Sequence, residues 1–143
     1  MPPAELLYNE THLWVSCEGD VALVGPTVHG LEQYGDVVAV ELPEKETELV
    51  HGDELGELEC TRGVWELYAP IDGVVMEVND ALVRHPELIN DDPFGEGWLI
   101  RLKLRDRQQL DHLLTAGEYE TLVEEEAELA EEEEEDEFNL LGE

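Results

Sequence analysis

Short apolar runs alternate with polar residues along most of the chain, and Gly-Asp or Asp-Gly pairs separate several of them. The segment from Trp98 to Leu104 shows the pattern most clearly, because Arg101 and Lys103 alternate there with apolar residues, as in a half-buried strand. Valine-rich runs such as VALVG and VVAVEL favour strands because β-branched side chains pack well on a pleated surface. The predicted strands lie at 12–17, 20–25, 36–42, 55–60, 65–69, 72–78 and 97–104. Several short strands at this spacing are typical of an all-β sandwich or barrel.

Helices are expected to be few and short. Thr27 is an N-cap residue type at the start of a helix that we predict to reach Tyr34. Asp106 is a similar cap for a second helix over 106–115, in which leucines recur at helical spacing. We expect Gly117 to break the chain and a further helix to follow it, with one apolar face packed on the sheets.

The composition changes sharply near the C-terminus. From Glu124 onward the sequence reads EEEAELAEEEEEDEFNLLGE, which contains no Lys or Arg. Like charges at this density repel one another, so we predict a domain over 1–126 and an acidic tail over 127–143 that is disordered or marginally helical. The apolar patch at Phe138–Leu141 is either a docking peptide or part of a solubilising tail, and we favour the tail.

Thirty-eight acidic residues against seven basic ones give a formal net charge of -31. Such a chain repels nucleic-acid backbones and anionic membranes, and no apolar run approaches the roughly 18 residues that a membrane span needs. The N-terminus lacks the features of a secretory signal, and Cys17 and Cys60 have no C-x-x-C spacing. We therefore expect a cytoplasmic protein with reduced thiols, and a highly salted cytoplasm is one hypothesis for its charge.

Motifs for catalysis or metal binding are missing from the sequence. No nucleophile elbow or phosphate loop occurs, and the five histidines have no zinc-ligand spacing, so we predict no catalytic residue and no metal site. Cys60 lies two residues from Arg62, whose charge would lower the pKa of a nearby thiol. The alternative, which we favour, is that Cys60 is an inward-facing strand residue alternating with Glu59.

Several strings together resemble one family. YNETHLWV, GDVVAVELPE, LYAPIDGVVMEVN, PELINDDPFGEGWLIRLKL and AGEYETLVEEE occur in order over residues 8–126 and are similar to the glycine cleavage system H proteins. The resemblance implies a mainly β fold, a flattened barrel-sandwich hybrid of the lipoyl/biotinyl type with short helices and C-terminal helical elements. It also implies a carrier without an active site of its own. A lipoyl-lysine in this family takes an aminomethyl group from the glycine decarboxylase to the aminomethyltransferase, and dihydrolipoamide dehydrogenase then reoxidises it.

The lipoyl-attachment segment departs from the family pattern in this chain. The resemblance puts Arg62 at the position of the lysine, and Trp65 where a small residue is expected. Because a guanidinium offers no free amine, we expect no lipoate on Arg62 and no other cofactor. The main interpretation is therefore a binding or accessory module for glycine cleavage enzymes or lipoate-attaching enzymes. Its predicted partner-binding loop consists of Glu59, Cys60, Arg62, Trp65 and Glu66, with Arg62 pairing with a partner carboxylate and Trp65 acting as an anchor.

An alternative interpretation keeps the carrier function. The chain would then work in glycine cleavage, or in another lipoate-linked pathway such as sulfur oxidation, with the arm on a non-standard lysine. Lys45, in a turn after a predicted strand, and Lys103, within the last strand, are the two lysines of the sequence. Neither matches the attachment pattern, so the sequence favours the module without an arm.

Overall fold

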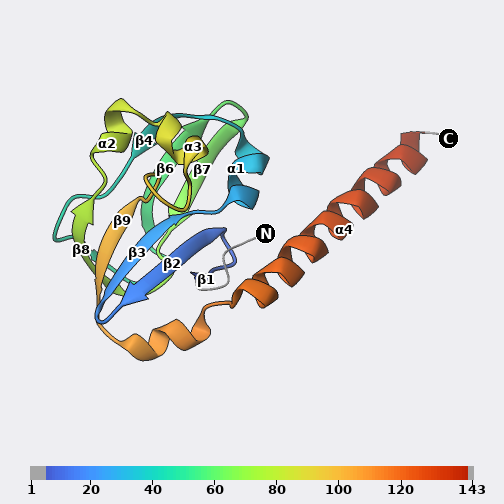
Figure 1. Cartoon of the computed structure of the whole chain (residues 1–143). Helices are drawn as coiled ribbons and strands as arrows, with labels where there is room; N and C mark the ends of the chain where they lie inside the picture. The colour runs from blue at the N-terminus through green and yellow to red at the C-terminus, as the bar shows by residue number, and fades with distance from the viewer. Residues whose placement is uncertain (1–5, 142–143) are drawn as a thin grey trace.

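The computed structural model describes residues 6–141, with side chains up to residue 128, as a β body followed by a long C-terminal helix (Figure 1). The hairpin of β6 and β7 lies in the middle of the chain, and the elements are grouped here up to β6 and from β7 onward. The first group is β1 (Leu7–Tyr8), β2 (Leu13–Glu18), β3 (Val21–Pro26), α1 (Val28–Tyr34), β4 (Val37–Glu41), β5 (Glu48–Leu49) and β6 (Glu54–Cys60). The second group is β7 (Gly63–Tyr68), β8 (Gly73–Val78), α2 (Ala81–Arg84), α3 (Glu87–Asp91), β9 (Ile100–Leu104), the 3₁₀ helix η1 (Arg107–His112) and α4 (Ala116–Leu141).

The strands form two antiparallel sheets. One has six strands in the order β1-β2-β3-β9-β8-β5, and the other has three in the order β4-β6-β7. The buried faces of both sheets enclose one aliphatic core, to which Leu58 and Leu67 of the small sheet and Ile100 and Leu102 of the large sheet contribute fully buried side chains. The predicted mainly β fold, with short helices and a C-terminal helix, is therefore confirmed.

Seven of the nine observed strands coincide with predicted ones to within a few residues. The two others, β1 and β5, have two residues each and are too short to show a periodicity. The prediction for 97–104 begins too early. The side chain of Asn79 donates hydrogen bonds to the carbonyls of Glu96 and Trp98, both at 2.8 Å, and this holds the chain in a turn before β9 begins at Ile100.

The observed helices differ from the predicted ones at several places. Thr27 caps α1 as predicted, because its hydroxyl accepts the N–H of Gly30, but the helix predicted over 106–115 is the shorter 3₁₀ helix η1. The chain leaves η1 so that Leu114 can form a β-bridge with Tyr8, with N–H···O distances of 2.7 and 2.8 Å. The short helices α2 and α3, which contact β4, were not predicted.

Gly117 does not break the chain but lies in the first turn of α4. Thr115 and Glu118 form a capping box, in which each side chain accepts the backbone N–H of the other residue. Tyr119 on the next turn is 2% exposed and stacks on Tyr8 with ring centroids 4.6 Å apart. The helix is therefore attached to the β body through its first turns.

Further along, α4 extends away from the body (Figure 1) and continues to Leu141. The division into a domain over 1–126 and a tail over 127–143 stays a prediction. The side chains of Phe138, Leu140 and Leu141 lie outside those that the structure describes. In the part of the chain that the structure describes, none of the helices combines the length and the apolar character needed to cross a lipid bilayer.

Candidate functional site

The hairpin formed by β6 and β7 carries all five residues of the predicted partner-binding loop. Cys60 pairs with Gly63, so Thr61 and Arg62 form a two-residue turn at the tip. Gly63 has a φ of 145°, a conformation that an L side chain rarely adopts. A glycine is therefore required directly after the turn, where the backbone enters β7.

The end of α1 and its connection to β4 hold this turn in place. The N–H groups of Thr61 and Arg62 donate to the carbonyls of Asp36 and Tyr34, at 2.9 and 3.0 Å. The backbone at Gly35 lies very close to the turn, because a Cβ on Gly35 would be 2.4 Å from the hydroxyl oxygen of Thr61. The hairpin tip and the C-terminal end of α1 therefore form one hydrogen-bonded unit.

Arg62 is exposed, and its guanidinium folds back onto α1. Its Nη1 donates to the carbonyl oxygen of Glu32 at 3.1 Å, which is one of the carbonyls left unpaired at a helix C-terminus. A cation is favoured there because the C-terminal end of a helix carries a partial negative charge. In the described part of the chain, the guanidinium makes no salt bridge with Glu59 or Glu66.

Trp65 does not lie on the surface of the loop. The indole is 3% exposed, stacks on Tyr34 with ring centroids 5.3 Å apart and planes at 6°, and contacts the backbone of α1 at Gly30. A side chain that anchors a partner has to be exposed, so the predicted anchor role of Trp65 needs correction, since alternation along β7 turns residue 65 toward the core. Its position fixes the packing of α1 on the hairpin.

Cys60 is half-buried against the core, as expected for an inward-facing strand residue. Burial raises the pKa of the Cys60 thiol, so less thiolate forms at neutral pH than for a free cysteine. This contradicts the idea that Arg62 lowers the pKa of this thiol. The guanidinium is directed at α1, and the thiol is not an activated nucleophile.

The outer face of the small sheet is acidic. Glu57 of β6 lies between Glu41 of β4 and Glu66 of β7 in the strand register, so carboxylates stand side by side across all three strands. Desolvation and the neighbouring Glu41 raise the pKa of Glu57. Glu66 is exposed, and the exposed Glu59 extends this acidic face toward the tip. The hairpin thus presents carboxylates along its side and a cation at its apex.

Both lysines lie away from this tip. Lys45 is exposed in the connection between β4 and β5, and the pairing of Val37 with Cys60 shows that β4 runs away from the tip toward that connection. Lys103 is in the middle of β9, in register with Val21 and Val74 on the neighbouring strands. Its side chain is exposed on the face of a sheet, as the alternation predicted.

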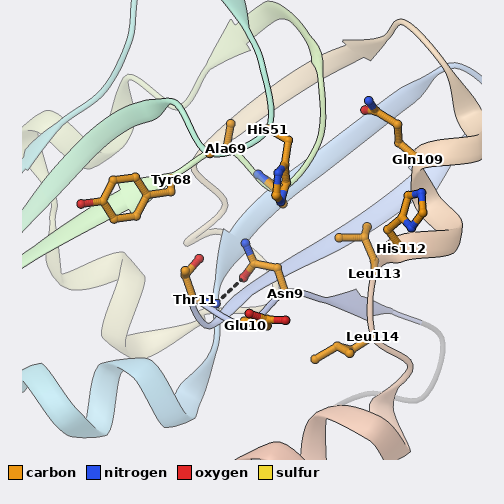
Figure 2. Close-up of a pocket in the computed structure, with 12 residues that line it drawn as sticks. Asn9, Glu10, Thr11, His51, Tyr68, Ala69, Gln109, His112, Leu113 and Leu114 are labelled. Carbon is orange, nitrogen blue, oxygen red and sulfur yellow. Dashed lines mark hydrogen bonds between the residues drawn. The ribbon is translucent and has the colours of Figure 1, made fainter.

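A pocket of about 460 Å³ lies where four segments meet (Figure 2). It is lined by residues of the turn before β2, the connections around His51 and Ala69, and the segment from Gln109 to Leu114. The lining is mainly apolar, and Thr11 has a buried hydroxyl oxygen without a hydrogen-bond partner among the described residues. Sequence reasoning missed this pocket because its residues come from distant turns and share no motif.

Two of the five histidines converge with a carboxylate, although their sequence spacing does not suggest it. His12 and His29 both direct Nε2 at Glu126 Oε2, at 3.1 and 3.3 Å. His12 has a φ of 68°, which histidine tolerates better than most residues. Its Nδ1 lies 2.8 Å from the hydroxyl oxygen of Tyr119, whose pKa is raised to about 12 by burial.

A family model described as glycine cleavage H-protein matches residues 6–126. The chain belongs to the glycine cleavage H-protein family. Relatives include a glycine cleavage system H protein of Symbiobacterium thermophilum, 45% identical over 86% of this chain and 96% of the relative. Another, from Staphylococcus carnosus, is 41% identical over 85% of this chain and 96% of the relative.

The fold agrees with this family. A crystal structure of a glycine cleavage system H protein from Mycobacterium marinum aligns with a TM-score of 0.74 and 36% sequence identity, over 82% of this chain and 95% of that chain. Members of the family carry lipoate and have no catalytic activity of their own. The expectation that the chain is not an enzyme is therefore confirmed by family membership.

Proposed function

We propose that this chain docks on glycine cleavage enzymes as an H-protein-family module whose β6–β7 hairpin carries arginine in place of the lipoyl-lysine. The observation that carries the proposal is Arg62 at the apex of a two-residue turn, the kind of position from which a side chain can reach a partner. A guanidinium has no primary amine that can form an amide with lipoate. The residues at this tip therefore do not fit the cofactor of the family.

The contacts of the tip support a docking role. The backbone of the turn is held by α1, so little conformational freedom is lost when a partner binds. Arg62 is exposed and its guanidinium retains donors that the single bond to Glu32 leaves unused, so it is able to form a bidentate pair with a partner carboxylate. Val64 beside it is 50% exposed and offers an apolar contact.

The charge of the hairpin indicates the chemistry of the partner surface. Exposed Glu59 and Glu66 flank the tip, and the whole chain carries a formal net charge of -31. A partner surface with basic residues around a central carboxylate would complement this pattern. The decarboxylase, the aminomethyltransferase, dihydrolipoamide dehydrogenase and the lipoate-attaching enzymes are the proposed partners, since each handles the lipoyl arm in this family.

A second function is favoured by the similarity to curated H proteins over most of the chain. In this alternative the protein is a working carrier, in glycine cleavage or another lipoate-linked pathway, with lipoate on Lys45 or Lys103. Both lysines are exposed and therefore accessible to a modifying enzyme. Their distance from the tip would require the carrier to dock in a different orientation.

Intact-mass spectrometry of the protein from its native cells distinguishes the two functions. Peptide mapping would cover residues 55–70 and both lysine regions. An unmodified mass, together with binding to a glycine cleavage enzyme that weakens in Arg62→Ala, would support the armless module. A lipoyl group mapped to Lys45 or Lys103 would overturn it and establish the carrier.

A matched in vitro test uses Arg62→Lys, which restores an amine at the same backbone position. We expect a lipoate-attaching enzyme to leave the wild-type tip unmodified and to lipoylate the variant at residue 62. Equal modification of the two proteins, or of residue 62 in neither, would contradict the assignment of this position as the attachment site.

A further inference from the structure

Three donor atoms converge where α1, α4 and the turn before β2 meet. The Nε2 atoms of His12 and His29 lie 3.1 and 3.3 Å from Oε2 of Glu126, and all three donor atoms are within 4.8 Å of one another. His12 is buried, while His29 and Glu126 are partly exposed. The cluster is therefore built on the body of the protein and open to solvent on one side.

The spacing of these atoms fits a transition-metal ion. With bond lengths of about 2.0–2.1 Å, ligand atoms around a tetrahedral zinc ion lie roughly 3.3 Å apart. The two His-to-Glu126 distances have this length, and rotation of the partly exposed His29 side chain would adjust the third. Two imidazoles and one carboxylate also form a donor set found at zinc sites that keep a fourth position open.

Hydrogen bonds around Tyr119 orient the imidazole of His12 for this role. Tyr119 lies 2.8 Å from Nδ1 of His12 and 2.7 Å from the hydroxyl of Thr27. An N–H on Nδ1 that donates to Tyr119 leaves an unprotonated Nε2 facing Glu126, and metal-bound histidines typically have such a partner on the other ring nitrogen. The amide nitrogen of Gln33 lies 3.2 Å from Nε2 of His29 and donates to the same lone pair that would bind the metal, so the exposed Gln33 side chain has to move aside when the ion binds.

We propose that His12, His29 and Glu126 bind one divalent transition-metal ion, such as Zn²⁺, and that this ion fastens α4 to the β body. With His12 in the tautomer that donates from Nδ1 to Tyr119, its Nε2 lone pair faces the Glu126 carboxylate at 3.1 Å, and a cation bound between them would stabilise this arrangement. The competing arrangement has an N–H of each imidazole donating to Glu126, and it needs no metal. The proposal is independent of lipoate and of the role of Arg62.

The test uses the full chain without a histidine tag, stripped of metal with a chelator and dialysed. Zn²⁺ is titrated by calorimetry, and Co²⁺ by visible absorption, which reports a tetrahedral site. We expect one ion per chain in the wild type, and at least a tenfold lower affinity in His29→Ala and in Glu126→Gln. Both residues are partly exposed, so circular dichroism should show folded variants.

Two controls separate a specific site from attraction to an acidic chain. Glu125→Gln removes the same charge from the neighbouring position of α4, and His85→Ala breaks an exposed His–Glu pair, the contact with Glu87 at 3.1 Å. We expect both to bind Zn²⁺ within twofold of the wild type. Zn²⁺ should also raise the thermal unfolding midpoint of the wild type but not that of Glu126→Gln.

Equal affinities of Glu126→Gln and Glu125→Gln for Zn²⁺ would overturn the proposal. So would the absence of a saturable site in the wild type. Either result would indicate that the imidazoles donate hydrogen bonds to Glu126 and that the cluster is a structural attachment of α4.

Discussion

Trp65 connects the hairpin to α1, and its removal should cost a large fraction of the stability of the protein. The indole is 3% exposed and stacks on Tyr34, so Trp65→Ala would leave a cavity between β7 and α1. Buried Trp-to-Ala changes destabilise proteins by about 3–5 kcal/mol, of which about 0.5–1.5 kcal/mol belongs to an aromatic pair. Domains have total stabilities of only about 5–15 kcal/mol, so this loss would be readily measured.

Chemical denaturation followed by far-UV circular dichroism measures the free energy of unfolding without relying on tryptophan fluorescence. The matched control is Val64→Ala, next to Trp65 but 50% exposed, which should change the free energy by no more than about 0.5 kcal/mol. A loss below about 1 kcal/mol for Trp65→Ala would contradict its placement between the hairpin and the helix.

A double-mutant cycle tests the contact itself. A Cβ on Gly30 would lie 2.4 Å from the Trp65 ring, so we expect Gly30→Ala to destabilise the wild type by about 1–3 kcal/mol through overpacking. In a Trp65→Leu background the ring is absent, and the same change should cost clearly less. Equal effects of Gly30→Ala in the two backgrounds would refute the packing argument, because residues in contact are expected to be non-additive.

Three further predictions concern single residues. Because burial raises the pKa of Cys60, its alkylation at neutral pH should be slower than that of a free thiol, and its rate should titrate at a higher pH than that of a free thiol. Peptide mapping of an alkylation series at several pH values measures both. Hydrogen bonds with the His51 N–H and with Gln109 lower the pKa of Asp72. The stability that the wild type gains over Asp72→Asn should therefore be complete above the unfolded-state pKa of Asp72 and disappear as the pH falls through its folded-state pKa. A difference in stability between the two proteins that is the same at all pH values of an acid titration would contradict this. The side-chain oxygen of Asn90 accepts a hydrogen bond from the N–H of buried Val37 at 2.8 Å. Asn90→Ala should therefore lower the free energy of unfolding by about 1–3 kcal/mol in denaturant titrations, and an unchanged denaturation midpoint would exclude that contact.

Local sequence patterns predicted the elements that have a clear hydrophobic periodicity or an N-cap residue. The alternation ahead of Leu104 marks β9, and the Thr27 side chain marks the start of α1. The sequence predicted η1 less well, since leucines at helical spacing do not reveal that Leu114 must leave the helix to pair with Tyr8. That pairing joins residues far apart in the chain, and no periodicity within one segment records it.

The same distinction applies to the candidate site. The sequence alone places Arg62 in a turn between two strands, and its guanidinium chemistry follows from the residue type. The tertiary structure decided that this guanidinium folds onto the carbonyl of Glu32 and that Trp65 points inward. Both depend on how α1 packs against the hairpin, which is a contact between separate elements.

By itself, therefore, the sequence determined the β-rich class, the acidic surface and the position of a cationic turn. Each of these follows from composition or from the spacing of neighbouring residues. Only the tertiary structure brought His12 and His29 together with Glu126 and joined the hairpin tip to α1. Such convergence arises when two sheets and a C-terminal helix bury their apolar faces together, and this arrangement is not encoded within any single segment.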